Sequence, residues 1–101
     1  MGVLLKGGVL VMKMDKKFTG AIVKVKDGSP VPEDEYVVFL VKDRAFVEYG
    51  LPAYLQGCIE LGADDVQIKM VEEMRIRAEQ WQHDHPDRVK VPDAAGEMRL
   101  P

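Results

Sequence analysis

The sequence has few of the residues on which most catalytic and metal sites depend. It contains one cysteine and two histidines among 101 residues. A single cysteine, Cys58, cannot form an internal disulfide or a cysteine-based zinc site, and it predicts a reducing, intracellular setting. His83 and His85 are two positions apart, whereas metal-binding pairs on one helix face are three or four apart. This pair suits a metal only where the helix has already ended, so we expect no metal and no other cofactor.

The sequence also lacks a long hydrophobic run. No apolar stretch approaches the roughly 20 residues of a membrane-spanning helix. The first residues are apolar, but Lys6 and the pair Gly7-Gly8 interrupt them, and no small-residue cleavage site follows, so they do not resemble a signal peptide. We expect a cytoplasmic protein without a membrane anchor. Residues 1–14 are either an extra strand or an extension.

A glycine-rich phosphate loop and a paired nucleophile and base are missing as well. Gly7-Gly8 is too short to cradle a phosphate, and no residue near Cys58 in the sequence provides a base. Cys58 falls on the apolar side of a predicted helix, where a thiol acts as a small buried hydrophobe. The carboxylates of residues 33–35 stand in a predicted loop without a histidine. The sequence therefore predicts a protein that is not an enzyme.

Charge is unevenly distributed along the chain, whose net charge is -3. Residues 1–26 contain six lysines and one acidic residue, Asp15, whereas the remainder has eight basic and sixteen acidic residues. The lysines are either the solvated face of a strand or an anion-binding arm, and we favour the first interpretation. They are too widely spread for a dense nucleic-acid patch, so we do not expect nucleic-acid binding.

The most apolar segment is residues 36–41, six apolar residues with β-branched and aromatic side chains. This composition predicts a strand that is covered on both faces. Residues 18–26 alternate between two faces and predict a second strand, and residues 9–14 predict a third. Asp27-Gly28 predicts a turn, so the strands at 18–26 and 36–41 should pair antiparallel.

The second half of the sequence predicts two helices, at about 51–62 and 64–83. Pro52 suits a first helical turn, Gly62 suits a helix end, and Asp64 or Asp65 suits the next amino-terminal cap. The resulting fold class is α+β: one domain over residues 1–101, with a small antiparallel sheet packed against an αα-hairpin. Residues 94–101 should form a loose tail.

Two features predict that the fold is completed by homo-oligomerisation. The segment 36–41 requires cover on both faces. The second helix carries Ile68 and Ile76 outside its main apolar arc, which indicates burial on more than one side. A chain of this length has little further surface of its own to provide that cover.

Arg77 is the most informative candidate for binding. It lies inside the apolar arc of the second helix, which comprises Val66, Met70, Met74, Ala78 and Trp81. The guanidinium is paired with Glu73 one turn away, extends to the edge of the arc, or binds an anion. For the last case, the candidate ligand-binding residues are basic or aromatic: Arg77, Trp81, Arg75, Lys69, Arg44, Lys42 and Tyr49. The aromatic residues are alternatively core or interface anchors.

The order of these features resembles a known group. Pro32-Glu33-Asp34-Glu35 precedes a predicted strand ending Phe39-Leu40-Val41-Lys42-Asp43, and two helices follow, the second ending Glu79-Gln80-Trp81-Gln82. An extended Asp87-Arg88-Val89-Lys90-Val91-Pro92-Asp93 completes the pattern. Over residues 30–93 it resembles short accessory proteins of bacteriophages and prophages. The resemblance implies the cytoplasm of a bacterial host and no active-site residues.

Two functions follow as expectations. The first is a non-catalytic binding protein that sequesters a small anionic ligand, such as a nucleotide that signals host defence. The second is a homo-oligomeric interaction module that binds a host or phage protein. The basic and aromatic side chains, together with the resemblance, favour the first.

Overall fold

The computed structural model describes residues 3–6 and 9–100. The chain divides into two compact units. The helical unit is Phe39–Pro92, and the amino-terminal unit is Met1–Val38 together with Asp93–Pro101. The expectation of a single domain stays a prediction.

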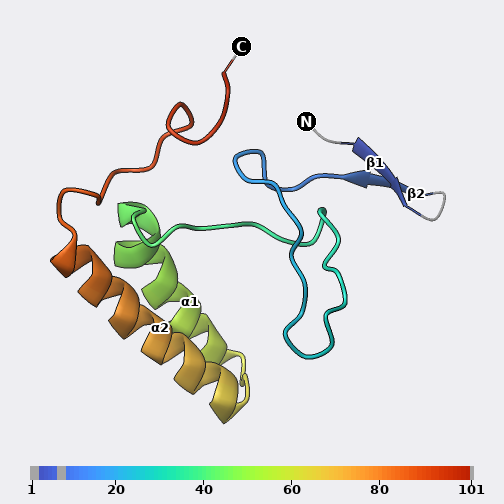
Figure 1. Ribbon diagram of the computed structural model, residues 1–101. Coiled ribbons are helices and arrows are strands. Elements are labelled where there is room, and N and C mark those ends of the chain that lie inside the picture. Colours follow the sequence, from blue (N-terminus) through green and yellow to red (C-terminus); the bar gives the residue numbers. More distant parts are fainter. Residues whose placement is uncertain (1–2, 7–8, 101) are drawn as a thin grey trace. The chain divides into compact units, whose positions relative to one another are not determined.

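The helical unit is a hairpin of two helices, α1 (Leu51–Glu60) and α2 (Asp65–Asp84), which lie side by side (Figure 1). Gly62 has φ +75° and ends the first helix, with the N–H of Ala63 bonded to the Cys58 carbonyl at 2.9 Å. Asp64 caps α2, since its carboxylate accepts from the N–H of Gln67 at 2.7 Å. The predicted αα-hairpin is confirmed, because its turn and caps depend on neighbours in the sequence.

The first helix begins earlier than expected. Residues 44–50 are already helical, and the Asp43 carboxylate caps them by accepting from the N–H of Phe46 at 2.9 Å. Within them, η1 (Phe46–Gly50) is a π-type turn that runs directly into α1. Gly50 does not end this helical segment, since its φ is helical at -68°. The wider turn ends two residues before Pro52, which has no N–H to donate.

The core of the helical unit is small. Its five buried apolar residues come from η1, α1 and α2: Val47, Leu51, Cys58, Val71 and Ala78. Four partly buried apolar residues pack against them: Phe46, Leu55, Ala63 and Ile68. The prediction that Cys58 is a buried hydrophobe is confirmed.

The segment after α2 closes the helical unit by returning to the residues before η1. The N–H of Arg44 donates to the Lys90 carbonyl at 2.9 Å, and the N–H of Lys90 donates to the Lys42 carbonyl at 3.0 Å. The side chain of Gln82 donates to the Val41 carbonyl at 2.9 Å. These contacts hold the two ends of the helical unit together.

The amino-terminal unit contains the strands β1 (Val3–Lys6) and β2 (Val9–Met12), which pair antiparallel with Val3 opposite Met12. β2 lies within the strand predicted at 9–14, but its partner is β1.

The predicted sheet packed against the helical hairpin is wrong. Neither 18–26 nor 36–41 is a strand in the part of the chain that the structure describes. The stretch 36–41 is not covered on both faces either, because the exposed fraction is 54% for Val37 and 42% for Val41.

The physical reason is that other partners take the backbone groups of these segments. Val31 donates its N–H to the Ile22 carbonyl at 2.8 Å, so the chain folds back locally around the Asp27-Gly28 turn. The N–H of Val38 donates to the carboxylate of Asp15 at 2.7 Å rather than to a neighbouring strand. A side chain therefore replaces the ladder that the apolar pattern had predicted.

The predicted loose tail contains a turn. The Asp93 carboxylate accepts from the N–H of Gly96 at 2.7 Å, and the N–H of Met98 donates to the Ala94 carbonyl at 2.9 Å. This turn belongs to the amino-terminal unit.

Candidate functional site

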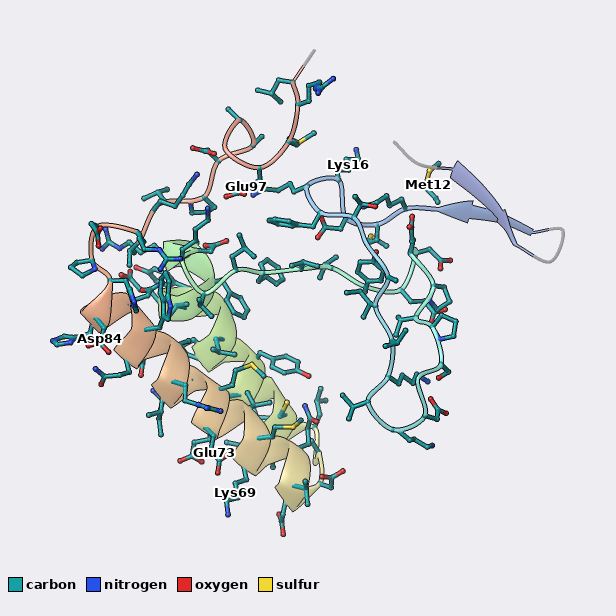
Figure 2. The ribbon with its side chains drawn as sticks, viewed as in Figure 1. Met12, Lys16, Lys69, Glu73, Asp84 and Glu97 are labelled. Atoms are coloured by element: carbon teal, nitrogen blue, oxygen red, sulfur yellow. The ribbon has the colours of Figure 1, made fainter. Side chains whose placement is uncertain are left out.

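The predicted ligand-binding residues do not converge on one position of the helical unit. Arg75 and Arg77 point in directions about 160° apart around α2, given 3.6 residues per turn. Lys69 and Glu73 lie on the side of α2 away from α1 (Figure 2). Lys42 precedes the first helix, and Tyr49 lies in η1 with an exposed fraction of 75%.

Two of the predicted cationic residues are already paired. The Arg44 guanidinium lies 2.6 Å from the Glu48 carboxylate, and that of Arg75 lies 3.2 Å from Glu79. Among the ion pairs described for the helical unit, the expected partnership of Arg77 with Glu73 does not occur. Binding of an anion by these residues stays a prediction.

Trp81 contacts residues of its own chain. Its ring stacks on the His85 imidazole with 4.5 Å between ring centroids, and the Arg88 guanidinium carbon lies 4.9 Å from the ring centroid. The Nδ1 atom of His85 is 2.8 Å from the Trp81 carbonyl. These contacts fasten the segment after α2 to the end of that helix. They support the interpretation of Trp81 as an anchor rather than a stacking platform for a ligand.

The apolar arc predicted for α2 is only partly buried. The residues that pack towards α1 are Val71 and Ala78, with Ile68 alongside. The amino-terminal part of the predicted arc is exposed, with exposed fractions of 77% for Val66 and 50% for Met70. Val71 and Ala78 are seven residues apart, which is two helical turns, and this spacing was the sequence signal for the face of α2 that packs on α1. The polar Arg75 lies between them and obscures it.

The exposed part of the arc is on the side of α2 where Tyr54 of α1 also lies. The side chain of Gln67 donates to the Tyr54 hydroxyl at 3.4 Å, which places Tyr54 on the Gln67 side of the hairpin. Val66, Met70 and Met74 recur at every fourth residue of α2 and follow the same side. We call these four residues the exposed apolar face: Tyr54, Val66, Met70 and Met74.

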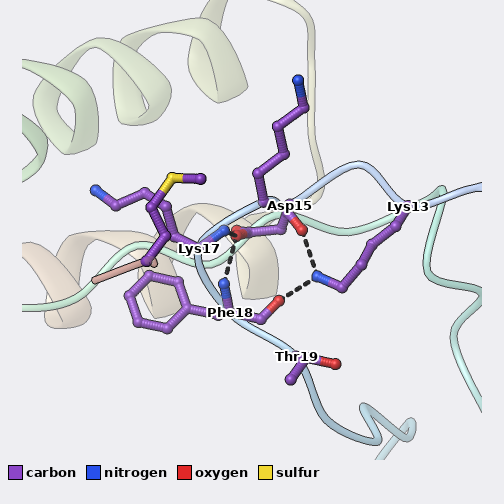
Figure 3. Close-up of a pocket in the computed structure, with 7 residues that line it drawn as sticks. Lys13, Asp15, Lys17, Phe18 and Thr19 are labelled. Carbon is purple, nitrogen blue, oxygen red and sulfur yellow. Dashed lines mark hydrogen bonds between the residues drawn. The ribbon is translucent and has the colours of Figure 1, made fainter. Parts of the chain in front are cut away.

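The amino-terminal unit has a separate polar cluster around Asp15 (Figure 3). The Asp15 side chain is 8% exposed, and one of its oxygens accepts from the N–H groups of Lys17 and Phe18, both at 2.8 Å. The ammonium of Lys13 donates to the backbone carbonyls of Asp15 and Phe18. The cluster thereby bends the chain between residues 13 and 18.

The pKa of Asp15 reflects this environment. Burial of the carboxyl raises its pKa, but hydrogen bonds from the N–H groups of Val38, Lys17 and Phe18, with the charge of Lys13, outweigh that effect. The pKa of Asp15 therefore lies below its ordinary value of 3.8, and the carboxylate is ionised at neutral pH.

Beside this cluster lies a hollow of about 290 Å³. Besides Asp15, it is lined by basic, apolar and hydroxyl side chains: Lys13, Lys16, Lys17, Phe18, Thr19 and Met98. The sequence did not predict this hollow, because the lysines of residues 1–26 suggest the solvated face of a strand. The alternative of an anion-binding arm within residues 1–26 was the only signal towards it.

Three further observations bear on function. No described helix combines the length and apolarity needed to span a membrane. In the described residues, no three metal-ligating side chains come together. Comparison with protein-family models, with curated proteins and with solved structures found no match. The resemblance to bacteriophage accessory proteins therefore stays a prediction.

Proposed function

We propose that this protein is a non-catalytic interaction module whose helical unit pairs with a second copy of itself through the exposed apolar face. The observation that carries this proposal is the exposure of that face. The exposed fraction is 56% for Tyr54, 77% for Val66, 50% for Met70 and 47% for Met74. Several exposed apolar side chains on one side of a hairpin are typical of interaction sites.

The small core supports the same proposal. Together, η1, α1 and α2 contain five buried apolar residues and remove little surface from water, and small cores give narrow stability margins. Two hairpins packed face to face would form a four-helix arrangement and bury a second apolar layer. A second copy is the occupant that this argument favours, because it brings an identical apolar face and a two-fold contact is self-complementary.

Methionine suits such a contact. Its unbranched thioether side chain adapts to an opposing surface, and methionine is enriched at protein interfaces. The resemblance to phage proteins supports a bacterial cytoplasmic setting for this module.

Sedimentation velocity of the full chain tests the proposal. We expect the wild-type protein to sediment as a dimer. A Met70→Gln/Met74→Gln variant should associate at least about tenfold more weakly, because it lacks two thioether side chains that the dimer contact would bury. The matched control replaces two methionines of the amino-terminal unit, Met12 and Met14, by Gln. These side chains are 52% and 57% exposed and belong to the amino-terminal unit.

Far-UV circular dichroism confirms that each variant keeps its helices. A wild-type protein that stays monomeric at its highest soluble concentration contradicts the proposal. Equal weakening by the two methionine pairs contradicts it too, since the contact would then not be specific to the helical unit. A monomer that binds one defined host protein through Met70 and Met74 would contradict self-association. It would instead support a module that binds a host protein.

A further inference from the structure

We propose that the hollow beside Asp15 binds a small phosphate monoester that carries an apolar or planar group. This inference concerns the amino-terminal unit and is independent of the exposed apolar face.

Charge is the first argument. Three lysines line the hollow, Lys13, Lys16 and Lys17, and Asp15 is the single carboxylate among the lining residues. The surplus of positive charge attracts an anion, and an ammonium group can donate up to three hydrogen bonds to phosphate oxygens.

The orientation of Asp15 is the second argument. Its two oxygens accept three backbone hydrogen bonds, from Lys17, Phe18 and Val38. The carboxylate thus acts as a structural acceptor that holds residues 15–18 in a bend. The bend contains the consecutive residues Lys16 and Lys17, and both of them line the hollow.

Lys13 is ordered by the same bend. Its ammonium donates to two backbone carbonyls, those of Asp15 and Phe18. Because an ammonium has three N–H donors, one remains for a ligand oxygen. A cation held in place in this way loses less conformational entropy on binding than a freely rotating lysine does.

The apolar lining and the size of the hollow define the ligand class. Phe18 and Met98 contribute apolar surface, and Thr19 contributes a hydroxyl. A volume of about 290 Å³ is close to the lower end of the range for small-molecule sites, roughly 300 to 1,000 Å³. The hollow therefore suits a phosphate with one ring system rather than a long polymer.

Nuclear magnetic resonance titration of the ¹⁵N-labelled full chain tests this inference, with adenosine monophosphate as the probe. We expect saturable shifts of the amides of residues 13–19. A Lys16→Gln/Lys17→Gln variant should bind about tenfold more weakly, because two charge-assisted hydrogen bonds are lost. A Lys24→Gln/Lys26→Gln variant is the matched control, since both lysines are exposed in the same unit and do not line the hollow.

Two further probes separate the parts of the ligand. Adenosine without phosphate should bind much more weakly if the lysines hold the anion, and inorganic phosphate should bind more weakly if Phe18 and Met98 hold the ring. Equal binding of adenosine and its monophosphate overturns the anion site, and equal binding of inorganic phosphate overturns the apolar part.

The lysine variants decide whether the site is local. Absence of saturable shifts in the wild-type protein overturns the inference, as does equal weakening by the two lysine pairs. The amide signals of Phe18 and Val38 report whether the bend persists in each variant. Because this experiment leaves Met70 and Met74 unchanged, its failure does not affect the proposed self-association.

Discussion

Different kinds of interaction stabilise the interior of each unit. All five buried apolar side chains that the structure describes belong to the helical unit. In the described part of the amino-terminal unit, the buried residue is a charged one, Asp15, and it accepts three backbone hydrogen bonds. One unit therefore depends on removing apolar surface from water, and the other on a directional polar centre.

This difference is the reason that we propose a different partner for each unit. The hydrophobic effect is non-directional, so a helical hairpin with too little core gains stability from any well-matched apolar surface, including its own copy. A bend fixed by hydrogen bonds presents charged groups at defined positions, which favours a small anionic ligand. The predictions below test whether the units depend on these separate interactions.

The largest expected effect is in the helical core. Leu51 is 1% exposed, and Leu51→Ala should lower the free energy of unfolding by about 2 to 5 kcal/mol through lost burial and a cavity. Urea denaturation followed by far-UV circular dichroism measures the change. Leu61→Ala is the matched control, because Leu61 is 90% exposed and its loss should change stability by less than about 0.5 kcal/mol.

A comparable loss in both leucine variants would show that burial in the hairpin does not dominate its stability. The amides of Lys17 and Phe18 should keep their exchange protection in Leu51→Ala, because Asp15 holds them without help from the hairpin core.

The next largest effect concerns Asp15. Asp15→Ala removes the acceptor of three N–H groups and should destabilise the bend by about 1 to 3 kcal/mol. Hydrogen exchange should accelerate at Lys17, Phe18 and Val38, while the core amides of α1 and α2 stay protected. Asp27→Ala is the control, since Asp27 accepts from the exposed Ser29 in a local turn. Unfolding of the hairpin in Asp15→Ala would contradict the independence of the units.

A smaller effect is expected at the start of α2. Asp64→Ala removes the cap on the N–H of Gln67 and should cost about 1 kcal/mol of stability. Thermal unfolding of the helical signal measures this loss. Asp65→Ala should cost only a few tenths of a kcal/mol, because Asp65 acts through the helix dipole alone. Equal losses would show that the cap contributes nothing beyond its charge.

The smallest effect is that of pH on the Asp15 bend. Because the pKa of Asp15 is lower in the folded chain than its ordinary value of 3.8, its contribution to stability is complete above that value. The contribution is lost as the pH falls through the folded pKa. Hydrogen exchange of Lys17 and Val38, corrected for its intrinsic pH dependence, should show this loss of protection below about pH 4.

Asp15→Asn removes the ionisable group and keeps one acceptor oxygen. The loss of protection at acidic pH should therefore disappear in that variant. A pH effect that persists in Asp15→Asn would assign it to another carboxyl group.

The elements predicted correctly are those whose signals lie within one helical turn. Gly62 ends α1 because it adopts a positive φ, and Asp64 caps α2 three residues before its hydrogen-bond donor. Cys58 is buried, as the helical periodicity predicted. The missed start of the first helix is also local, since Asp43 was interpreted as the end of a strand and not as a cap.

The errors concern choices between distant partners. The segment 36–41 has the composition of a strand, but the N–H of Val38 bonds to Asp15, which is 23 residues away in the sequence. The face of α2 that packs on α1 contains Arg75 beside Val71 and Ala78, so the apolar periodicity identified Ala78 but missed Val71. The hollow forms only because Met98, from the tail at residues 94–101, lies beside Lys16 and Phe18 of the bend. No local pattern in the sequence predicts that contact.

The sequence by itself therefore determined the two helices of the hairpin, the end of α1 at Gly62 and the cap of α2 at Asp64, because these follow from neighbouring side chains and backbone geometry. Only the tertiary structure decided which apolar residues remain exposed and where the lysines gather. Those outcomes depend on competition between long-range partners for the same backbone groups and the same apolar surface. Neither composition nor local spacing encodes which partner wins.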